Sequence, residues 1–561
     1  MSSANSPFKP PRQHKMVAWY SPTQLSKTAV DVLISLIFGR HADYRLIEAL
    51  GTPDIKIEDY TTRVAPDQDF WFDYVADVGD GWNSTYAIAY YLAQSQLKLQ
   101  DPEGQRYDTA RGSILIFGGD TVYPVASRQQ YKQRLQAPYA TALCKTNEPH
   151  PDAYVIPGNH DWYDSLAAYT RLFCAKRWFA GWRTKQDRSY FALKLPYHWW
   201  VIGTDIQLDS DIDDPQINFF RQVAAEMKPE DKVILCTAEP EWIFAKLYGK
   251  GDPEYSENNL AYLEDKLFQK KISIFLTGDL HHYRRHEDDH GTQKIVAGGG
   301  GAFLHPTHGQ DVKHLEGGFN LKKEFPDAAT SRKLCWRNFA FPFLNPTFGL
   351  LTAIFYLLTV WAVKTDLSAF GMGEFWDALV SVIHQALKTP IGMFWIVAVI
   401  LGFWAFTDTH SGAYRYIAGL LHGVAHLLAA FFLGWGAVLL CVYLGYPYDS
   451  IPQLLISGAI IFSGGWIVGS FIMGIYLFIS LNIFSRHSNE AFSSLAIQDW
   501  KNFLRIKIAA NGEVSIFPIG IERVPRKWKE RGPTLSGPYM IPDDANATAP
   551  ELLEKPIKVK P

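Results

Sequence analysis

The sequence has few cysteines and little net charge. Its five cysteines among 561 residues stand far apart, form no CxxC pair and are odd in number. This usage gives no disulfide framework, so we expect reduced, structural thiols. The formal net charge is only −3, which lacks the basic excess typical of nucleic-acid binding, and we expect no nucleic-acid partner.

An apolar leader is also absent from the start of the chain, which reads MSSANSPFKPPRQHKMVAWYSP. Without an apolar core this stretch does not resemble a signal peptide, so the domain that follows is expected to stay in the cytosol. Residues 1–65 are interpreted as an N-terminal segment with one amphipathic helix around Leu25–Leu50.

Long apolar runs are missing before about residue 340 and frequent after it. They cover 346–363, 390–406, 416–445 and 454–484. Each approaches or exceeds the roughly 18–20 residues that cross a bilayer. Residues 340–485 are therefore predicted to be an all-α transmembrane domain of about four helices, although a large soluble helical core is an alternative.

Basic residues flank this region on both sides. They are Arg332, Lys333 and Arg337 before it, and Arg486 and Lys501 after it. The positive-inside rule then places both flanks in the cytosol, which requires an even number of spans. The prediction is a multi-pass cell-membrane protein whose catalytic domain is cytoplasmic.

Residues 66–330 alternate short apolar runs with helical stretches, a pattern typical of an α/β layered domain. Runs such as SILIFGGD (113–120), AYVIPGNHD (153–161) and ISIFLTGDLHH (272–282) each close on polar residues. In such folds the strand ends line the site.

The chain after the membrane region becomes polar again. Residues 486–525 are predicted to be a cytosolic segment with a β-hairpin around Asn511-Gly512, a strong turn signal. Residues 526–561 are rich in proline and charge and are predicted to be a disordered tail.

Four predicted strand ends carry residues suited to metal binding. They read ADVGDG (76–81), GGD (118–120), PGNHD (157–161) and TGDLHHY (277–283). Carboxylate, amide and imidazole donors of this mix suit Mn²⁺, Fe or Zn²⁺ better than a thiolate site would. A carboxylate shared by two cations is a common way to activate water against a phosphorus ester.

The order GGD…GNHD…GDLHHY resembles the calcineurin-like metallophosphoesterase superfamily over roughly residues 70–305. The resemblance implies a two-sheet sandwich flanked by helices, two divalent metal ions (Mn or Fe/Zn) and a phosphate-ester substrate. It also implies a role for five residues: Asp77 as a first-metal ligand, Asp120 as the bridging carboxylate, Asn159 as a second-metal ligand, His160 as the catalytic histidine that stabilises the leaving group or phosphoryl oxygens, and His281 as the last family histidine.

The sequence departs from the family pattern at three places. Gly79 stands where the family has the histidine of Asp-x-His, Asp279 replaces the first histidine of Gly-His-x-His, and CTAEP (236–240) lacks a strand-end histidine. Carboxylates stand at or near each place, so Asp80, Asp279 and, less directly, Glu239 are candidate replacement ligands. Such an oxygen-rich site would favour Mn²⁺ or Mg²⁺ over Zn²⁺.

Three further histidines are candidates for substrate binding: His282, and His305 and His308 after the glycine run 298–301. A tight turn with solvated histidines is the competing interpretation. The resulting hypothesis is a membrane-anchored phosphoesterase that hydrolyses a phosphate ester or diphosphate at the cytosolic face, with a lipid ester as one candidate. The alternative is a catalytically degenerate domain that binds a phosphorylated ligand or regulates the membrane part. The oligomeric state is unknown from the sequence.

Overall fold

The computed structural model describes residues 11–27, 30, 56–144, 150–206, 212–248, 258–363, 374–407, 411–531 and 537–561. The chain forms two compact units: unit 1 comprises residues 1–17, 30–331 and 496–561, and unit 2 comprises residues 18–29 and 332–495. Most of the amphipathic helix expected around Leu25–Leu50 lies outside the described residues.

Unit 1 is built on two large sheets. In the first the order is β20-β17-β16-β2-β5-β6-β8-β7, with β21 also paired to β17. Its strands are β2 (Phe70–Val75), β5 (Ile114–Gly118), β6 (Asp152–Ile156), β7 (Trp178–Phe179), β8 (Trp182–Thr184), β16 (Lys501–Ile508), β17 (Val514–Ile521), β20 (Glu551–Leu552) and β21 (Ile557–Val559).

The second sheet has the order β1-β9-β10-β11-β12-β14-β13-β15. Its strands are β1 (Glu58–Asp59), β9 (Phe191–Leu195), β10 (Trp199–Gly203), β11 (Lys232–Cys236), β12 (Ile272–Thr277), β13 (Tyr283–Glu287), β14 (Gln293–Ala297) and β15 (Asn320–Phe325). Strands β2, β5 and β6 are mutually parallel in one sheet, as are β10, β11, β12 and β14 in the other.

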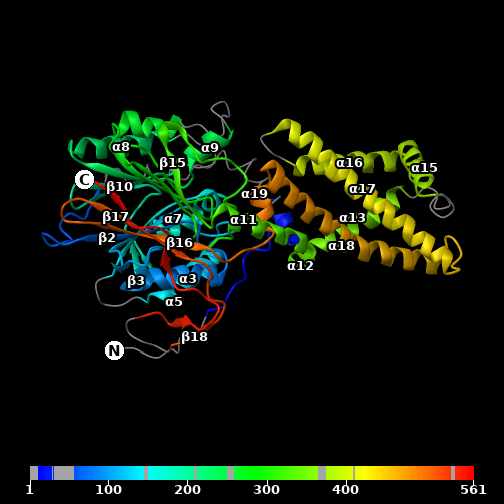
Figure 1. The fold of residues 1–561 in the computed structure, drawn as a ribbon, viewed down its shortest axis with the longest axis horizontal. Coiled ribbons are helices and arrows are strands. Elements are labelled where there is room, and N and C mark those ends of the chain that lie inside the picture. Colours follow the sequence, from blue (N-terminus) through cyan, green and yellow to red (C-terminus); the bar gives the residue numbers. More distant parts are fainter. Residues whose placement is uncertain are drawn as a thin grey trace. The chain divides into compact units, whose positions relative to one another are not determined.

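Three apolar layers hold the sheets and helices of unit 1 together. One joins the two sheets, with residues such as Ile116 facing Ile234 and Leu276. The others lie under α3 (Trp82–Ala93), α5 (Ala137–Ala142) and α7 (Ala167–Phe173) on one side, and under α8 (Asp214–Glu226) and α9 (Glu241–Tyr248) on the other. The strands in Figure 1 accordingly lie between α8 and α9 on one side and α3 and α5 on the other. The expected two-sheet α/β sandwich flanked by helices is confirmed.

The segment after the membrane region belongs to this sandwich. Residues Lys501–Ile508 and Val514–Ile521 form the predicted hairpin, and β16 also pairs along β2. The tail continues into β20 and β21, which pair with β17. The hairpin predicted within residues 486–525 is thus part of the large sheet, and the tail at 526–561, for which the sequence predicted disorder, supplies β20 and β21. These residues provide the hydrogen-bond partners that β2 and β17 would otherwise lack.

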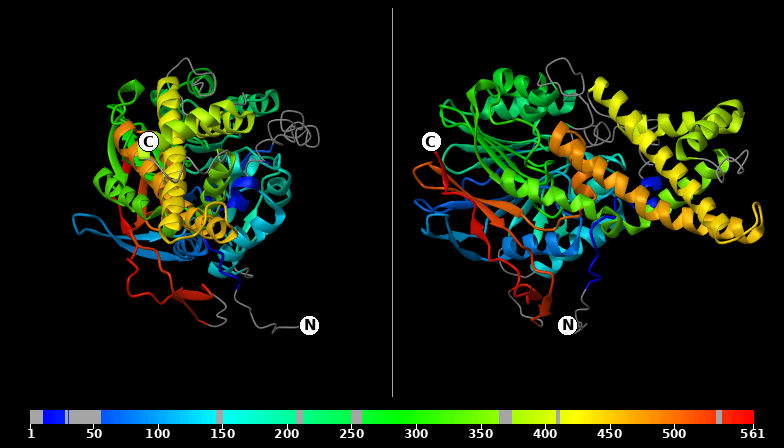
Figure 2. Two further views of the ribbon diagram at one scale, coloured as in Figure 1. Left: turned by 90° about the vertical axis from the view of Figure 1, so that its right-hand side faces the viewer. Right: turned by 45° about the vertical axis from the view of Figure 1, so that its right-hand side comes forward.

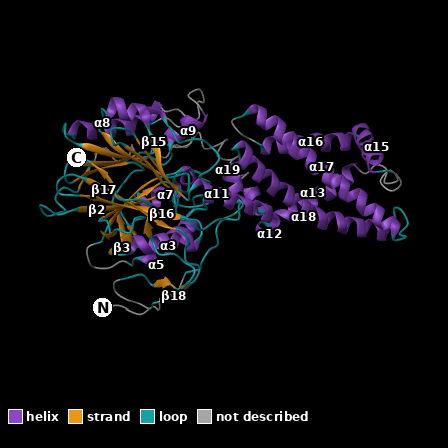
Figure 3. Cartoon of the chain, viewed as in Figure 1, coloured by secondary structure: helices purple, strands orange, loops and turns teal. Residues whose placement is uncertain are grey.

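Unit 2 is helical throughout its described part, as Figure 3 shows. Its main helices are α13 (Pro346–Val363), α15 (Phe375–Lys388), α16 (Pro390–Phe406), α17 (Gly412–Tyr443) and α18 (Ile451–Phe484). The four apolar stretches of the sequence are thus helices, and α17 and α18 run side by side (Figure 2).

Two of these helices, α17 and α18, are long and apolar enough to cross a membrane. The number rises to four if each of two bent helix pairs is one span; the bends are 64° before α13 and 103° between α15 and α16. The sequence did not predict α15, whose buried residues recur at helical spacing on one side only (Ala378, Leu379, Val382 and Ala386).

Small residues on α18 allow α13 to approach closely. A side chain at Gly469 would come within 2.6 Å of Cβ of Thr352, and one at Gly465 within 2.9 Å of Cβ of Tyr356. Such close approach through small residues is typical of helix packing in lipid.

Candidate metal centre

Three buried side chains meet where strands of both sheets end. Asp77 follows β2, Asp120 follows β5 and His281 follows β12. One ligand atom from each lies within 4.8 Å of the other two. All three residues have left-handed backbone conformations, with φ of 56°, 47° and 47°, and they include the first-metal and bridging aspartates that the family resemblance implied.

Asp77 is enclosed on all sides. Its Oδ1 accepts the backbone N–H of Asp279 at 3.0 Å, and a side chain at Gly298 would overlap Oδ2. Oδ2 is buried and has no hydrogen-bond partner among the described residues. Burial, followed by the charges of Asp120 and Asp279, raises the pKa of Asp77 well above its usual range. A cation would remove this cost.

Asp120 presents its two oxygens to different neighbours. Oδ1 accepts the backbone N–H of His160 at 3.0 Å, and Oδ2 accepts the hydroxyl of Tyr123 at 3.0 Å. The absence of a side chain at Gly158 leaves room for Oδ1, which a Cβ there would overlap. The carboxylate therefore lies between the GNHD loop and the His281 side of the site.

The ring of His281 is held in one tautomer. Its Nδ1–H donates to the carbonyl of Phe303 at 2.8 Å, so Nε2 carries the lone pair in the neutral ring. Burial, followed by the neighbouring His305, lowers the pKa of His281 well below its usual value and keeps the ring neutral. A neutral imidazole that lies this close to two carboxylates is suited to bind a metal ion.

Tyr123 is a site residue that sequence reasoning missed. Its hydroxyl lies 2.8 Å from Nε2 of His281 and 3.0 Å from Oδ2 of Asp120. The single hydroxyl proton of Tyr123 can be donated to only one of these two acceptors. A cation bound by Asp120 and His281 would satisfy the acceptor that does not receive the proton. The only signal in the sequence was that Tyr123 follows Asp120 by three residues in the same loop.

The donor set fits a divalent cation. Two carboxylates and a neutral imidazole converge, and Oδ1 of Asn159, beside the loop that contacts Asp120, is buried with no hydrogen-bond partner among the described residues. Oxygen and nitrogen donors of this kind suit Mn²⁺, Fe or Zn²⁺. The part of the chain that the structure describes contains one such group of three ligands, so a second ion remains a prediction.

Gly79 shows why the family histidine is absent at this position. Its φ is 67°, and a Cβ there would overlap the carbonyl oxygen of Thr121, so this backbone leaves no room for an imidazole. The neighbouring Asp80 lies outside the ligand group. Its Oδ1 accepts the backbone N–H of Val17 at 2.8 Å and lies 3.6 Å from Nη1 of Arg134. The structure thus shows Asp80 anchoring the N-terminal segment.

Asp279 borders the ligand group without belonging to it. Its backbone N–H donates to Oδ1 of Asp77 at 3.0 Å, and burial, followed by the charge of Asp120, raises the pKa of Asp279 to about 7. The segment CTAEP (236–240), which lacks a strand-end histidine, is held by backbone contacts. The carbonyl of Ala238 accepts the backbone N–H of Gly278 at 3.1 Å and the hydroxyl of Thr277 at 2.8 Å. Glu239, beside Ala238, is half-buried and lies outside the ligand group.

His160 lies at the rim of the centre and is half-buried. Its Nδ1–H donates to the carbonyl of Pro124 at 2.6 Å, which fixes the tautomer of the neutral ring. The ring centroid is 4.4 Å from that of Tyr123 and 5.1 Å from that of Tyr163.

The three predicted substrate histidines differ in position. His305 is half-buried, and its ring centroid is 3.9 Å from that of His281. His282 is fully buried, and His308 is buried with Nδ1 2.7 Å from Oγ of Ser331. A substrate entering from solvent would not reach these last two, so His282 and His308 are better explained as structural residues.

Lys501 has a role that the sequence did not suggest. It was counted among the basic residues flanking the membrane, but it is fully buried at the start of β16, and its Nζ donates to the carbonyl of Ala302 at 2.6 Å. Burial lowers the pKa of Lys501 to about 7, against opposing effects of nearby carboxylates that include Asp80 and Asp77. It therefore gives no information on membrane orientation.

The chain was compared with known families, curated proteins and solved structures. No family model matches it, and no curated protein matches it. Among the solved structures that it resembles is one titled "GAP50 the anchor in the inner membrane complex of Plasmodium". That similarity has 12% sequence identity and a TM-score of 0.30, and it covers 47% of this chain and 93% of the other. At this level the likeness carries no argument about function.

Proposed function

We propose that unit 1 is a metal-dependent phosphoesterase and that unit 2 attaches it to a membrane. The observation that carries this proposal is the buried group of Asp77, Asp120 and His281 at the converging strand ends of two sheets. Two buried carboxyl groups are held close together there, an arrangement that is costly unless a cation shares the site.

Each residue has a distinct part in the proposed chemistry. Asp77, His281 and Oδ2 of Asp120 would hold one ion, and Asn159 with Oδ1 of Asp120 would hold a second. A bound divalent cation supplies Lewis acidity, which lowers the pKa of water and polarises a phosphoryl oxygen. His160 would stabilise the phosphoryl oxygens or the leaving group, and its Nε2 would exchange a proton with the departing ester oxygen.

The substrate class follows from the attachment. A phosphoesterase joined to apolar helices would meet phosphate esters or diphosphates of lipids at the bilayer surface. Basic residues before the first apolar stretch (Arg332, Lys333 and Arg337) and Arg486 after the last favour a cytosolic position for unit 1.

Hydrolysis by the full chain tests the proposal. Protein stripped of metal with a chelator would be given Mn²⁺, Zn²⁺ or Mg²⁺ together with a chromogenic phosphodiester or a phospholipid. We expect turnover that needs added metal, and metal analysis that finds bound ions only when Asp77 and Asp120 are intact. Metal-free protein that hydrolyses the ester at the same rate would refute the assignment. A truncation after residue 340 is unsuitable, because it removes β16 and β17 from the sheet.

A second candidate is a domain that binds metal and a phosphorylated ligand without hydrolysis. The observation that favours it is the loss of imidazoles at Gly79 and Ala238, where backbone contacts are tight. Calorimetry with Mn²⁺ and inorganic phosphate distinguishes the two. Binding of both with no turnover of any ester would support this second function.

A further inference from the structure

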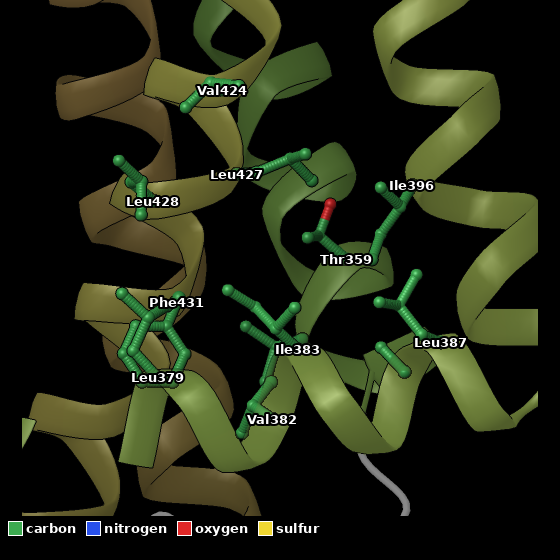
Figure 4. A pocket seen from close by; sticks show the side chains of 12 residues that line it. Thr359, Leu379, Val382, Ile383, Leu387, Ile396, Val424, Leu427, Leu428 and Phe431 are labelled. Atoms are coloured by element: carbon green, nitrogen blue, oxygen red, sulfur yellow. The ribbon is translucent and has the colours of Figure 1, made fainter. Parts of the chain in front are cut away.

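The helical unit contains an apolar cavity that the proposed enzyme chemistry does not use. It has a volume of about 230 Å³ and lies among α13, α15, α16 and α17. Its walls include Val382 and Leu387 of α15, Ile396 of α16, and Val424 and Phe431 of α17 (Figure 4). An apolar cavity of about 150 Å³ already stays dry and admits a benzene-sized molecule.

The cavity offers no polar group to a ligand. Thr359 is the only side chain with a polar atom among the residues that line it. Its Oγ1 donates to the carbonyl of Phe355 at 2.8 Å and accepts Nε1–H of Trp395 at 3.0 Å. Because that hydroxyl is already satisfied, a matching occupant would be hydrocarbon.

The mouth of the cavity is exposed on the side of the helices. Ile383, Leu387 and Leu428 line the cavity and are 44%, 56% and 42% exposed. Val380 and Ile391 are also exposed apolar side chains, at 65% each. With unit 2 attached to a membrane, as proposed above, such side chains would face lipid, and the molecules next to the mouth would be those of the bilayer.

A basic residue follows one of the mouth residues directly in the sequence. Lys388 follows directly on Leu387, is exposed, and ends α15. An ammonium group there complements the phosphate of an anionic phospholipid whose chain enters the cavity.

We propose that this cavity binds one acyl chain of an anionic glycerophospholipid, with the lipid phosphate at Lys388. An empty apolar cavity is destabilising in proportion to its volume, so an acyl chain would fill the space and join α15 to α17. The lipid would be a fixed component of unit 2 and independent of the phosphoester substrate.

The test is native mass spectrometry of the full chain extracted from vesicles containing equal parts phosphatidylglycerol and phosphatidylcholine. The wild type should retain one phospholipid per chain, enriched in phosphatidylglycerol. Val382→Phe and Val424→Phe fill the cavity from opposite walls and should reduce the retained fraction about tenfold. The matched control is Val380→Phe on the same helix, where Val380 is 65% exposed and does not line the cavity; it should retain lipid as the wild type does.

The charge is tested separately. Lys388→Gln should keep the lipid but lose the preference for phosphatidylglycerol, and Lys388→Arg should keep both. Equal retention in Val382→Phe, Val424→Phe and the wild type would overturn the proposal, as would loss in Val380→Phe. Retention of another apolar molecule at one per chain would overturn the phospholipid assignment. An unchanged preference in Lys388→Gln would overturn the position of the phosphate.

Discussion

Replacing Asp120 by asparagine removes one charge from the centre while keeping the size of the side chain. Oδ1 accepts the N–H of His160 and Oδ2 accepts the hydroxyl of Tyr123. An asparagine has one acceptor oxygen, so its NH₂ group must face one of these two donors. Because the Tyr123 hydroxyl can turn to Nε2 of His281 and accept from this NH₂ group, we expect the folded state to lose less than about 1 kcal/mol of stability.

The effect on activity should be larger than this structural cost. An amide cannot share negative charge between two cations, so ions held by Asp120→Asn would be fewer or weakly bound. We expect the metal-dependent rate to fall by at least about a hundredfold, which is ~2.7 kcal/mol of barrier. The charge of Asp120 also contributes to the raised pKa of Asp279, so this pKa should fall in the variant.

Asp101→Asn is the matched control. Asp101 is buried in unit 1; its Oδ1 accepts two backbone N–H groups, and its Oδ2 accepts the hydroxyl of Tyr107 at 3.3 Å. The same chemical change occurs there beside a tyrosine, outside the ligand group. Steady-state hydrolysis with Mn²⁺ and metal content would be measured for both variants. An Asp120→Asn protein that keeps more than about a tenth of the wild-type rate, a barrier change under ~1.4 kcal/mol, refutes the bridging role.

Three further predictions concern charge and backbone. Asp279 has a pKa of about 7, so a proton competes with metal below that pH. The affinity for Mn²⁺ measured by calorimetry should therefore rise as the pH increases through 7. In Asp279→Asn the affinity should rise less steeply. In the folded state the pKa of Lys501 is lowered from 10.5 to about 7, so between these two pH values the folded state binds fewer protons than the unfolded state. The stability measured by thermal unfolding should therefore rise with pH from about 7 to 10.5. Lys501→Met should abolish this rise. Gly79→Ala should lower the free energy of unfolding by more than about 2 kcal/mol. Gly291→Ala should lower it less, because both glycines have positive φ but a Cβ at Gly291 meets nothing within 4 Å. Equal losses of the two variants in denaturant titrations would contradict the steric argument.

Local sequence was sufficient to predict the strands but not all of their partners. Runs such as 114–118 and 272–277 are mostly apolar and are followed directly by glycine and aspartate, so their identity as buried strands depends on nearby residues alone. The pairing of β16 with β2 joins residues that are more than 400 positions apart in sequence. Periodicity holds no information on such a contact, so the hairpin was predicted correctly and its place in the sheet was not.

For the candidate site, too, the sequence predicted some features correctly and missed others. Motif spacing identified the strand ends that bring Asp77, Asp120 and His281 together. It could not give side-chain direction, because adjacent residues in a tight loop point to different neighbours. Asp80 therefore contacts Val17 instead of the centre, and Tyr123 contacts the centre without any motif to mark it.

The order of segments along the chain adds a consequence for how the centre forms. The helical unit is interposed in sequence between β15 and β16, and β16 supports the loop beside Asp77. Asn502 donates its backbone N–H to Gly299 at 3.0 Å, and Lys501 donates to the carbonyl of Ala302, whose own N–H bonds the carbonyl of Asp77 at 2.9 Å. Residues made after the long helices thus support the backbone of a candidate metal ligand made before them. Because residues 332–495 of unit 2 are inserted between strands of the sandwich, the candidate centre cannot be completed until all these helices have been synthesised.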